Sequence, residues 1–378
     1  MNHSGWFFGV EFDWFADGVS LFICEAQWPY SSPRCGRLAC TEWKSISVPA
    51  SRLHHDKPIS FEEPLPMNLR TKYTMLVVWG VLVFVSSAST FAADTVKLVR
   101  SGDTVAVTIN GEEFATYQFA KSLPKPFFSP VKLAGTQLSR PIVGEDYKGD
   151  HPHHKGIWVS VDEVNEIKFW AEKGKIENRS LELFAAEGNP AKLKTENHWL
   201  GDDGKAVLIE TTTIGIHANR LLSYDIRLRM ASGDVHFRDT KEGLLGFRLA
   251  ESMREDKGSG VITNADGKNG SKECWGQRSA WVDYVGPVDG KSFGVTIFDH
   301  PKNFRPSRYH VRNYGLFSVS PFGEAAYTNN QEKPVDDVFP KGSELRMRYG
   351  IFFHTGDAAS AKLPDVNAQF LKASEGEK

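Results

Sequence analysis

Residues 103–119 read DTVAVTINGEEFATYQF, and this stretch decides the fold class. Apolar and polar side chains alternate on both sides of Asn110-Gly111. An Asn-Gly pair between alternating runs is the strongest short-range hairpin signal, because a two-residue type I′ turn requires positive φ at both central positions. The stretch therefore predicts a β-hairpin at the start of the folded domain.

Further alternating runs occupy the rest of the chain. Residues 222–230 and 345–353 place apolar side chains at every second position, which indicates strands with one buried face. Only residues 365–373 have the pattern of a helix. Strands at this density without intervening helices predict one large antiparallel β domain, a sandwich or a barrel. Shorter runs of the same kind lie at 207–216, 235–239, 244–250, 281–285, 293–298 and 316–319.

The composition agrees with a globular β protein. The chain has 378 residues, of which 40% are hydrophobic and 24% charged, enough for a substantial core. Its 33 glycines, 19 prolines and 12% aromatic residues favour a turn-rich β fold over a helical bundle. Because 45 Lys and Arg nearly balance 47 Asp and Glu, there is no basic excess for nucleic acid or an anionic membrane, and we expect neither as a partner.

A single long apolar run, MLVVWGVLVFV, occupies residues 75–85. Arg70 and Lys72 precede it, and small residues follow it up to Ala92. A basic region, a short apolar core and small residues at the cleavage position are typical of a secretory signal peptide. A membrane helix needs roughly 20 apolar residues. Residues 67–92 therefore predict a cleaved signal, no stable membrane span afterwards, and a periplasmic or secreted protein.

Residues 1–66 show no steady hydrophobic period and read as no domain. We interpret them as a mis-assigned extension upstream of a true start at Met67; the alternative is a cytoplasmic tail before a single anchor. Residues 93–378 would then form the mature chain, a single β domain whose one cysteine, Cys274, cannot form an internal disulfide. Cys274 lies beside no histidine motif, which argues against a thiol nucleophile.

The densest group of reactive side chains is DHPHHKG at residues 150–156. In an extended segment His151 and His153 point the same way, so both imidazoles could reach one metal ion or one substrate hydroxyl. Three histidines within four residues are costly to bury unless each is paired. His151, His153 and His154 therefore predict a site for general acid–base catalysis, with His151 and His153 as candidate ligands of a divalent metal. The alternative is a solvated loop.

Two tryptophans follow the histidines in the sequence. Trp158 and Trp170 could form a stacking wall for a sugar ring, whose CH face packs on aromatic surfaces, or could equally belong to the core. Asn165, between them, suits either a turn or a contact to the same ligand.

Polar clusters near the ends of later strands complete the candidate site. Asp299 and His300 end a strand beside a proline, where a β scaffold tends to carry loop chemistry; an aspartate that caps a turn is the alternative. Arg312 suits a carboxylate or an anionic sugar through its bidentate fork, or a structural ion pair. His310 and His354 are further candidates for substrate binding, and His354 falls on the polar face of its strand. We expect Asp299, His300 and Arg312 to approach the histidine loop in space.

Five motifs, in order, resemble one protein family. They are DHPHH at 150–154, DEVNEIKFW at 162–170, WGQRSAWVDY at 275–284, FDHP at 298–301 and HVRNYGLF at 310–317. From about residue 140 to 357 the chain resembles the exported bacterial PmoA-like family, which carries the label methane oxygenase and is otherwise of unknown function. Glu166 and Lys168 stand where its members more often have glycine and aspartate.

The resemblance implies carbohydrate chemistry, because the family's usual company is secreted sugar-processing proteins. It also implies the supersandwich of galactose mutarotases, so the predicted fold is a large antiparallel β-sandwich of this type with a short C-terminal helix. The oxygenase label fits poorly, since particulate methane oxidation uses a multi-span membrane assembly. Signatures of serine hydrolases and of nucleotide-binding and dinucleotide-binding proteins are absent from the sequence.

Three functions remain open. The first is a carbohydrate-active hydrolase, lyase or epimerase-like enzyme for a small-molecule or oligosaccharide substrate, in which a loop histidine is the general acid or base and Asp299 or Glu163 its partner. The second is a metalloenzyme, such as an oxygenase, with His151, His153 and one later histidine (His300, His310 or His354) around iron or copper. The third is a non-catalytic sugar-binding module that uses the two tryptophans as a platform.

The signal peptide is directly testable. Because signal peptidase cleaves after small residues, we expect the native protein to begin near Ala93 or Asp94. Mass spectrometry of protein purified from its natural host checks this N-terminus. Recovery of peptides from residues 1–66 in the mature protein would contradict the assignment.

Overall fold

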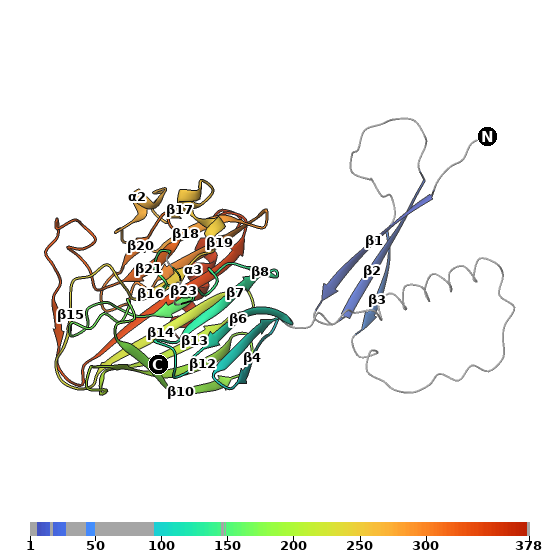
Figure 1. Ribbon diagram of the computed structural model, residues 1–378. Helices are drawn as coiled ribbons and strands as arrows, with labels where there is room; N and C mark the ends of the chain where they lie inside the picture. Colours follow the sequence, from blue (N-terminus) through green and yellow to red (C-terminus); the bar gives the residue numbers. More distant parts are fainter. Residues whose placement is uncertain are drawn as a thin grey trace. The chain divides into compact units, whose positions relative to one another are not determined.

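The computed structural model describes residues 6–15, 18–27, 43–49, 94–144, 147 and 149–375. The chain separates into two compact units, Met1–Ser89 and Thr90–Lys378. In the first unit, β1 (Trp6–Phe15), β2 (Gly18–Gln27) and β3 (Trp43–Pro49) form an antiparallel sheet in that order (Figure 1).

The predicted signal peptide at residues 67–92 lies outside the described residues, so its assignment stays a prediction. Within the described part of the chain, no helix has the length and apolar character needed to cross a membrane.

The second unit contains two large antiparallel sheets. The first has eight strands in the order β10-β12-β13-β14-β23-β19-β18-β17. Every neighbouring pair is antiparallel. The strands are β10 (Lys175–Ala185), β12 (Ala191–Leu200), β13 (Ala206–Ile216), β14 (Leu221–Met230), β17 (Val261–Asn264), β18 (Trp281–Val288), β19 (Lys291–Asp299) and β23 (Glu344–Thr355).

The second large sheet has ten strands, ordered β11-β4-β5-β6-β7-β9-β16-β21-β20, with β8 paired to β7. They are β4 (Val96–Ser101), β5 (Thr104–Ile109), β6 (Glu112–Gln118), β7 (Phe127–Leu133), β8 (Thr136–Gln137), β9 (Ile157–Val159), β11 (Glu187–Gly188), β16 (Leu245–Arg248), β20 (Arg308–Val311) and β21 (Leu316–Ser320). A separate small sheet pairs β15 (Val235–Phe237) with β22 (Asp337–Phe339). The helices are η2 (Glu251–Met253), η3 (Glu255–Lys257), α2 (Ser271–Cys274) and α3 (Leu363–Glu375).

The Asn110-Gly111 turn joins β5 to β6, as the sequence predicts. Asn110 has a φ of 53° and Gly111 a φ of 84°, the positive values that a type I′ turn requires. The Asn110 side chain also ties down the preceding strand, because its Oδ1 accepts a hydrogen bond from the Thr95 backbone N at 2.9 Å. Strand β4 comes before the hairpin, so the hairpin supplies the second and third strands of this unit.

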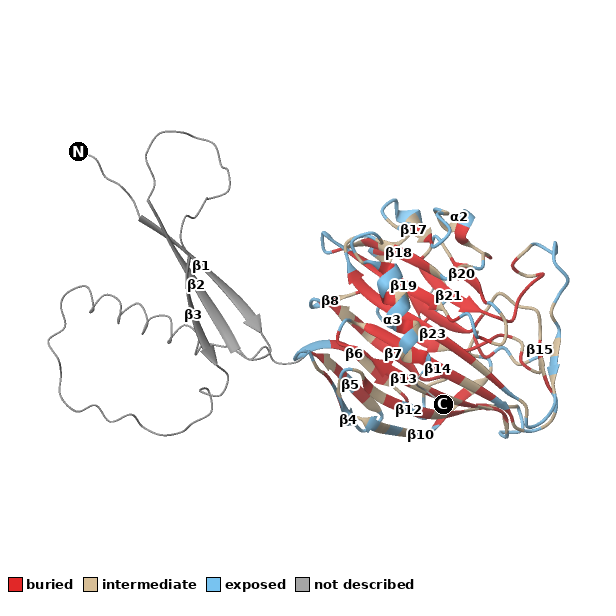
Figure 2. Ribbon diagram, turned by 180° about the vertical axis from the view of Figure 1, so that it is seen from behind, coloured by how far each residue is buried: buried red, intermediate tan, exposed pale blue. Residues whose placement is uncertain are grey.

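The apolar side chains of the two large sheets form one core between them. The Phe353 ring of β23 meets the Phe114 ring of β6 at 5.7 Å and the Phe247 ring of β16 at 5.4 Å between centroids. Figure 2 shows buried residues along most strands of both sheets. The predicted all-β fold, a large antiparallel supersandwich with a short C-terminal helix, is confirmed.

The sequence predicts one buried face for β14 and β23, yet both strands are buried along most of their length on both faces. Helix α3 explains the difference, because it packs against these two strands. Its Phe370 ring lies 6.0 Å from that of Phe298, and a Cβ on Gly350 would lie 3.1 Å from Phe370. These contacts belong to a second apolar cluster, separate from the core between the sheets.

A single row of residues crosses β9, β16, β21 and β20 on the face away from that core. Trp158, Gly246, Ser318 and His310 lie directly opposite one another along it. Residues paired in this way point to the same face of a sheet, while their neighbours along each strand point to the other. This cross-strand row underlies the candidate site, and Gly246 leaves room in it for the large Trp158 side chain.

A methyl group at position 246 should disturb two indoles. A Cβ there would lie 2.8 Å from Trp158 Cζ2 and 2.9 Å from Trp170 Cη2, closer than Cβ atoms normally approach. Since both rings are buried, we expect Gly246→Ala to lower the free energy of unfolding by about 1–3 kcal/mol. Urea unfolding checks this. Gly233→Ala is the control, because a Cβ at Gly233 meets nothing within 4 Å, and equal stability of the two variants would contradict the packing.

Candidate functional site

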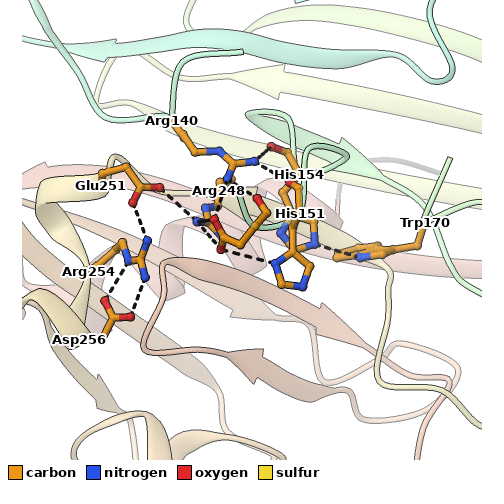
Figure 3. A network of polar contacts seen from close by, with 9 residues as sticks. Arg140, His151, His154, Trp170, Arg248, Glu251, Arg254 and Asp256 are labelled. Carbon is orange, nitrogen blue, oxygen red and sulfur yellow. Dashed lines mark hydrogen bonds and ion pairs between the residues drawn. The ribbon is translucent and has the colours of Figure 1, made fainter. Parts of the chain in front are cut away.

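The histidine loop, residues 150–156, leads directly into β9, and a buried arginine holds its backbone (Figure 3). Arg140 donates from Nη1 to the Asp150 carbonyl at 2.9 Å. Its Nη2 donates to the carbonyls of His151 at 2.6 Å and His154 at 3.1 Å. One guanidinium therefore fixes three points of the loop.

A second buried arginine holds the loop's carboxylate. Arg248 Nη2 donates to Asp150 Oδ2 at 2.9 Å and to Glu251 Oε1 at 3.1 Å. Farther out, Arg254 bonds Glu251 Oε2 at 2.6 Å and grips Asp256 with two nitrogens (Figure 3). Partial burial raises the pKa of Asp150, but the charge and hydrogen bonds of Arg248 outweigh this and lower it overall. Asp150 consequently stays ionised and anchored.

Four aromatic rings stack in a column beside the loop. The Tyr314 and His151 centroids are 5.1 Å apart, those of His151 and His154 4.7 Å, and those of His154 and Trp158 5.4 Å. The first two pairs are almost parallel, at 1° and 5°. The Arg248 guanidinium lies 5.2 Å from the Tyr314 ring centroid. The column holds His151 in place although its side chain is 42% exposed.

His154 is buried and neutral. Trp170 Nε1 donates to His154 Nε2 at 3.2 Å, and because an indole nitrogen can only donate, the proton of the neutral imidazole sits on Nδ1. Burial and the neighbouring His153 and His151 lower the pKa of His154 well below its ordinary value. Its Nδ1 has no hydrogen-bond partner among the described residues. His154 is therefore a positioning residue that ties the loop to Trp170.

His153 is the loop histidine with an uncommitted ring, since no hydrogen bond joins its ring nitrogens to another described residue. Burial and the charge of Lys125 lower its pKa to about 4, while carboxylates, Glu242 among them, act in the opposite direction. The ring is therefore neutral at pH 7.

Lys125 supports His153 from behind. Its buried Nζ donates to the His153 carbonyl at 2.9 Å and to Glu172 Oε1 at 2.6 Å. Burial lowers the pKa of Lys125 to about 8, and the Glu172 carboxylate opposes that shift. Glu172 also binds Lys155 Nζ at 2.8 Å. One carboxylate therefore links Lys125, which holds the His153 carbonyl, to Lys155 in the same loop.

His310 lies at the far end of the cross-strand row and is 1% exposed. Its Nδ1 lies 2.8 Å from the Lys241 carbonyl oxygen. A carbonyl can only accept, so Nδ1 carries the proton and Nε2 of the neutral ring has a free lone pair. Burial lowers the pKa of His310 to about 4, against the opposing effects of the Glu242 carboxylate and the Lys241 hydrogen bond. This geometry leaves Nε2 as the ring nitrogen that can accept a hydrogen bond or a proton.

Glu242 is the acidic group common to the site. Its charge opposes the lowering of the pKa at His310 and, after Glu172, at His153, while no described hydrogen bond or ion pair joins Glu242 to either imidazole. Burial and the Glu242 charge also raise the pKa of Asp162 to about 6. The nearest cation to Glu242 is Lys241, whose Nζ lies 3.0 Å from its Oε1. No motif marks Glu242 in the sequence, and we did not predict its role.

One protein family matches most of this chain. The sequence model of a family of unknown function, DUF6807, covers residues 104–367. The chain belongs to DUF6807. The matched residues include the eight-stranded sheet, the ten-stranded sheet except β4, and the histidine loop. No curated protein matches the DUF6807 chain significantly.

Three solved structures illustrate what the chain is similar to, each at a TM-score below 0.4. Heparan sulfate lyase HepC from Pedobacter heparinus is 9% identical, with a TM-score of 0.36, over 77% of this chain and 42% of the lyase. Galactose 1-epimerase from Lactobacillus acidophilus NCFM is 9% identical, with a TM-score of 0.36, over 70% of this chain and 99% of the epimerase. The GalM/aldose epimerase homologue from C. elegans is 8% identical, with a TM-score of 0.31, over 70% of this chain and 100% of that protein. The DUF6807 chain thus spans less than half the length of the lyase.

The two tryptophans of the DUF6807 chain do not fit the predicted sugar platform. Trp158 and Trp170 are 2% and 1% exposed, and their rings lie 4.8 Å apart. They pack with Phe127 and Leu316 in a small apolar cluster over Gly246. Burial leaves neither ring a free face for a ligand, so the alternative of core residues applies.

Asn165 and Glu163 lie in a turn after β9. Asn165 has a φ of 50°, and its Oδ1 accepts a hydrogen bond from the His236 backbone N at 2.8 Å. Glu163 pairs with Lys168 at 3.0 Å, and both side chains are exposed. Asn165 therefore shapes the turn, and the described contacts give Glu163 no link to the histidine loop.

Asp299 and His300 belong to a different part of the DUF6807 fold. Asp299 accepts hydrogen bonds from the Ser307 backbone N at 2.9 Å and from Asn303 Nδ2 at 2.8 Å, and burial raises its pKa to about 6. The His300 ring lies 5.8 Å from that of Phe370 in α3. Their described contacts cap the end of β19 and do not include the histidine loop. The expected approach of this pair is therefore not found, and the turn-capping alternative applies.

His354 is buried, whereas the sequence predicts that it faces polar space. Its Nε2 lies 3.0 Å from Asp283 Oδ1, and the two side chains are 4% and 0% exposed. Thr296 Oγ1 donates to the same oxygen at 2.8 Å. Gly294 makes this pocket, because a Cβ there would overlap the His354 ring. These residues lie in the eight-stranded sheet, so His354 is not part of the candidate site.

The metal-centre alternative finds no support in the geometry. Across the described residues, no group of three or more His, Cys, Asp or Glu side chains is arranged to hold a metal ion. The His151 and His153 rings are 5.7 Å apart and nearly perpendicular, and His151 is committed to the ring column. Of the later histidines, His300 and His354 lie elsewhere.

Arg312 does lie at the site. Its guanidinium carbon is 5.6 Å from the centroid of the Tyr314 ring, which in turn stacks on His151. Its charge also contributes to the lowered pKa of His310, after the larger effect of burial. The structure therefore brings Arg312 to the histidine loop through Tyr314, while the described ring and hydrogen-bond contacts of His310 are with Lys241, Trp275 and Tyr327.

Acidification should destabilise the fold through its neutral histidines. An unfolded histidine has a pKa near 6.5, so between that pH and the folded values the unfolded chain binds protons that the folded chain excludes. The contribution of these neutral histidines to the free energy of unfolding is fully present above pH 6.5 and is lost as the pH falls toward 4. Asp162 and Asp299, with pKa values raised to about 6 by burial, and Glu210, whose pKa burial also raises, act the other way but are fewer than the five histidines. Burial lowers the pKa of His153, His217, His300 and His310 to about 4 and that of His154 further.

We expect the free energy of unfolding to fall between pH 7 and pH 5, and to fall less steeply in His300→Asn. The difference should reach about 1.4 kcal/mol per pH unit, the value for one proton. Urea unfolding at several pH values measures both slopes, with His198→Asn on β12 as the matched control. An unchanged slope in His300→Asn would contradict the burial of a neutral ring.

Proposed function

We propose that this DUF6807 protein acts on a carbohydrate by general acid–base chemistry, with Glu242, His153 and His310 as the groups that handle protons. The observation that supports this most directly is the geometry of His310, whose Nδ1 is held by the Lys241 carbonyl oxygen at 2.8 Å, so that Nε2 of the neutral ring is the nitrogen left to accept a proton. The Glu242 carboxylate acts electrostatically on this ring and on that of His153. A negative charge near an imidazole favours the imidazolium that forms when the ring takes up a proton.

The protonation states suggest how the roles divide. His310 Nε2 carries the lone pair and would accept a proton from a sugar hydroxyl or from carbon, while Nδ1 stays hydrogen-bonded to the Lys241 carbonyl. Glu242 would stabilise the imidazolium that forms. His153, with no fixed hydrogen bond, can donate to or accept from the substrate. The Tyr314 phenol stays protonated as a further donor, because burial raises its pKa to about 12.

A sugar suits this site because its chemistry is rich in hydroxyl groups that need paired donors and acceptors. Neutral imidazoles, a phenol, a guanidinium and a carboxylate supply both kinds of group. The reaction classes that need only such proton transfer are glycoside hydrolysis, elimination and epimerisation. Export of the protein, from residues 67–92, and kinship with the PmoA-like family, from the five motifs, are part of the same proposal.

Replacing Glu242 tests the proposal. We expect Glu242→Gln to reduce turnover about 100-fold or more while the fold stays intact, because the amide keeps the shape but not the charge. Incubation with a panel of mono- and oligosaccharides, followed by proton NMR, measures both substrate binding and conversion. His153→Ala should likewise abolish conversion.

Glu196→Gln is the matched control, since Glu196 lies 3.0 Å from a histidine, His198, on β12 and outside the candidate site. Full activity of Glu242→Gln would remove Glu242 from the mechanism. Binding of sugars without any conversion by the unaltered protein would identify a binding module in place of an enzyme.

A further inference from the structure

A pocket of about 290 Å³ adjoins the candidate site and carries two cations. Its lining residues are Ser271, Lys272, Trp275, Val311, Arg312 and Asn313, none of them acidic. They come from α2 and its C-terminal end and from the end of β20, two elements that lie side by side (Figure 1).

Two lining residues of the pocket border the proposed catalytic groups. The Trp275 ring stands perpendicular to the His310 ring, with centroids 6.3 Å apart. The Arg312 guanidinium lies over the Tyr314 ring, which stacks on His151 in the ring column. The pocket therefore lies beside the candidate site, one side chain away from His310.

The two cations of the pocket have no carboxylate partner among the described residues, although Glu255 Oε1 accepts a hydrogen bond from the backbone N of the lining residue Ser271 at 2.9 Å. The other arginines nearby have carboxylate partners: Arg248 binds Asp150, Arg254 binds Asp256, and Arg278 binds Glu324. Arg312 and Lys272, by contrast, form no ion pair with any described residue.

A third donor at the pocket also lacks an acceptor. Nε1 of Trp275 is buried and has no hydrogen-bond partner within the described part of the chain. The Arg312 guanidinium and the Lys272 ammonium group form a set of donors with no acidic group among the lining residues. Charge-assisted hydrogen bonds from such donors favour an anion with several oxygens.

We infer that this pocket binds an oxyanion carried by the substrate, so that the natural substrate is an acidic sugar with a carboxylate or a sulfate ester. The inference rests on the proposed action on carbohydrate and narrows its substrate class. Arg312 would bind the oxyanion through two parallel N–H groups, and Lys272 would add a second positive charge at the solvent side.

The test is a calorimetric titration of the whole protein with three ligands that differ in one group: methyl glucoside, methyl glucuronide and a methyl glucoside sulfate. We expect at least one acidic ligand to bind about tenfold tighter than the neutral one at low salt, and this preference to shrink at high salt. The better acidic ligand identifies the oxyanion.

Variants locate the preference. Arg312→Gln should remove most of the preference, and Lys272→Gln part of it. Arg229→Gln is the matched control, because Arg229 is exposed on β14 in the other large sheet and should keep the preference intact. Circular dichroism and urea unfolding verify that each variant is folded.

Two results would overturn the inference, and they are distinguishable from failure of the proposed function. Equal binding of neutral and acidic sugars refutes the oxyanion pocket and leaves carbohydrate action standing, as does a preference that survives in Arg312→Gln. If no sugar binds, the proposed function fails, and titration with inorganic sulfate decides the pocket alone: binding lost in Arg312→Gln supports it, and no binding refutes it.

Discussion

The grip of Arg140 and Arg248 on residues 150–154 is the interaction on which the site depends. Both guanidinium groups are buried, and a buried cation is tolerated only where carboxylates and carbonyls surround it. Asp150 and the backbone carbonyls of the loop provide these groups. The hydrogen bonds that compensate the buried charges of the two arginines are therefore the same ones that fix the path of the loop. They also set the positions of the loop's imidazoles.

The same surroundings decide the charge of the imidazoles. Burial is the main reason that His153 and His310 are neutral, and the cations Lys125 and Arg312 add to it. Nearby positive charges disfavour a protonated imidazole, and a nearby carboxylate is needed to favour it. In the function that we propose, Glu242 is that group for both rings. The scaffold thus keeps both imidazoles unprotonated in the resting state. In the proposed function, the Glu242 carboxylate stabilises each ring once it is protonated.

Local patterns predicted the fold well, and the site only in part. The Asn110-Gly111 turn has one favourable geometry, so its hairpin could be read directly from the sequence. The histidine loop was visible because its reactive groups are consecutive. Glu242 was not, because an isolated acidic residue gains its role only when distant segments meet around it. The burial of Trp158 depends on a glycine in another strand, and the separation of His300 from the loop depends on which sheet β19 joins.

Gly246 also limits how this chain can change over evolutionary time. The two indoles fill the volume that a side chain at position 246 would need, so positions 246, 158 and 170 cannot vary independently. A larger residue at 246 is compatible with the fold only when a smaller ring arises opposite it. Because Trp170 also holds His154, such an exchange would reach the histidine loop within two contacts. Gly246 thereby restricts which substitutions the histidine loop can tolerate.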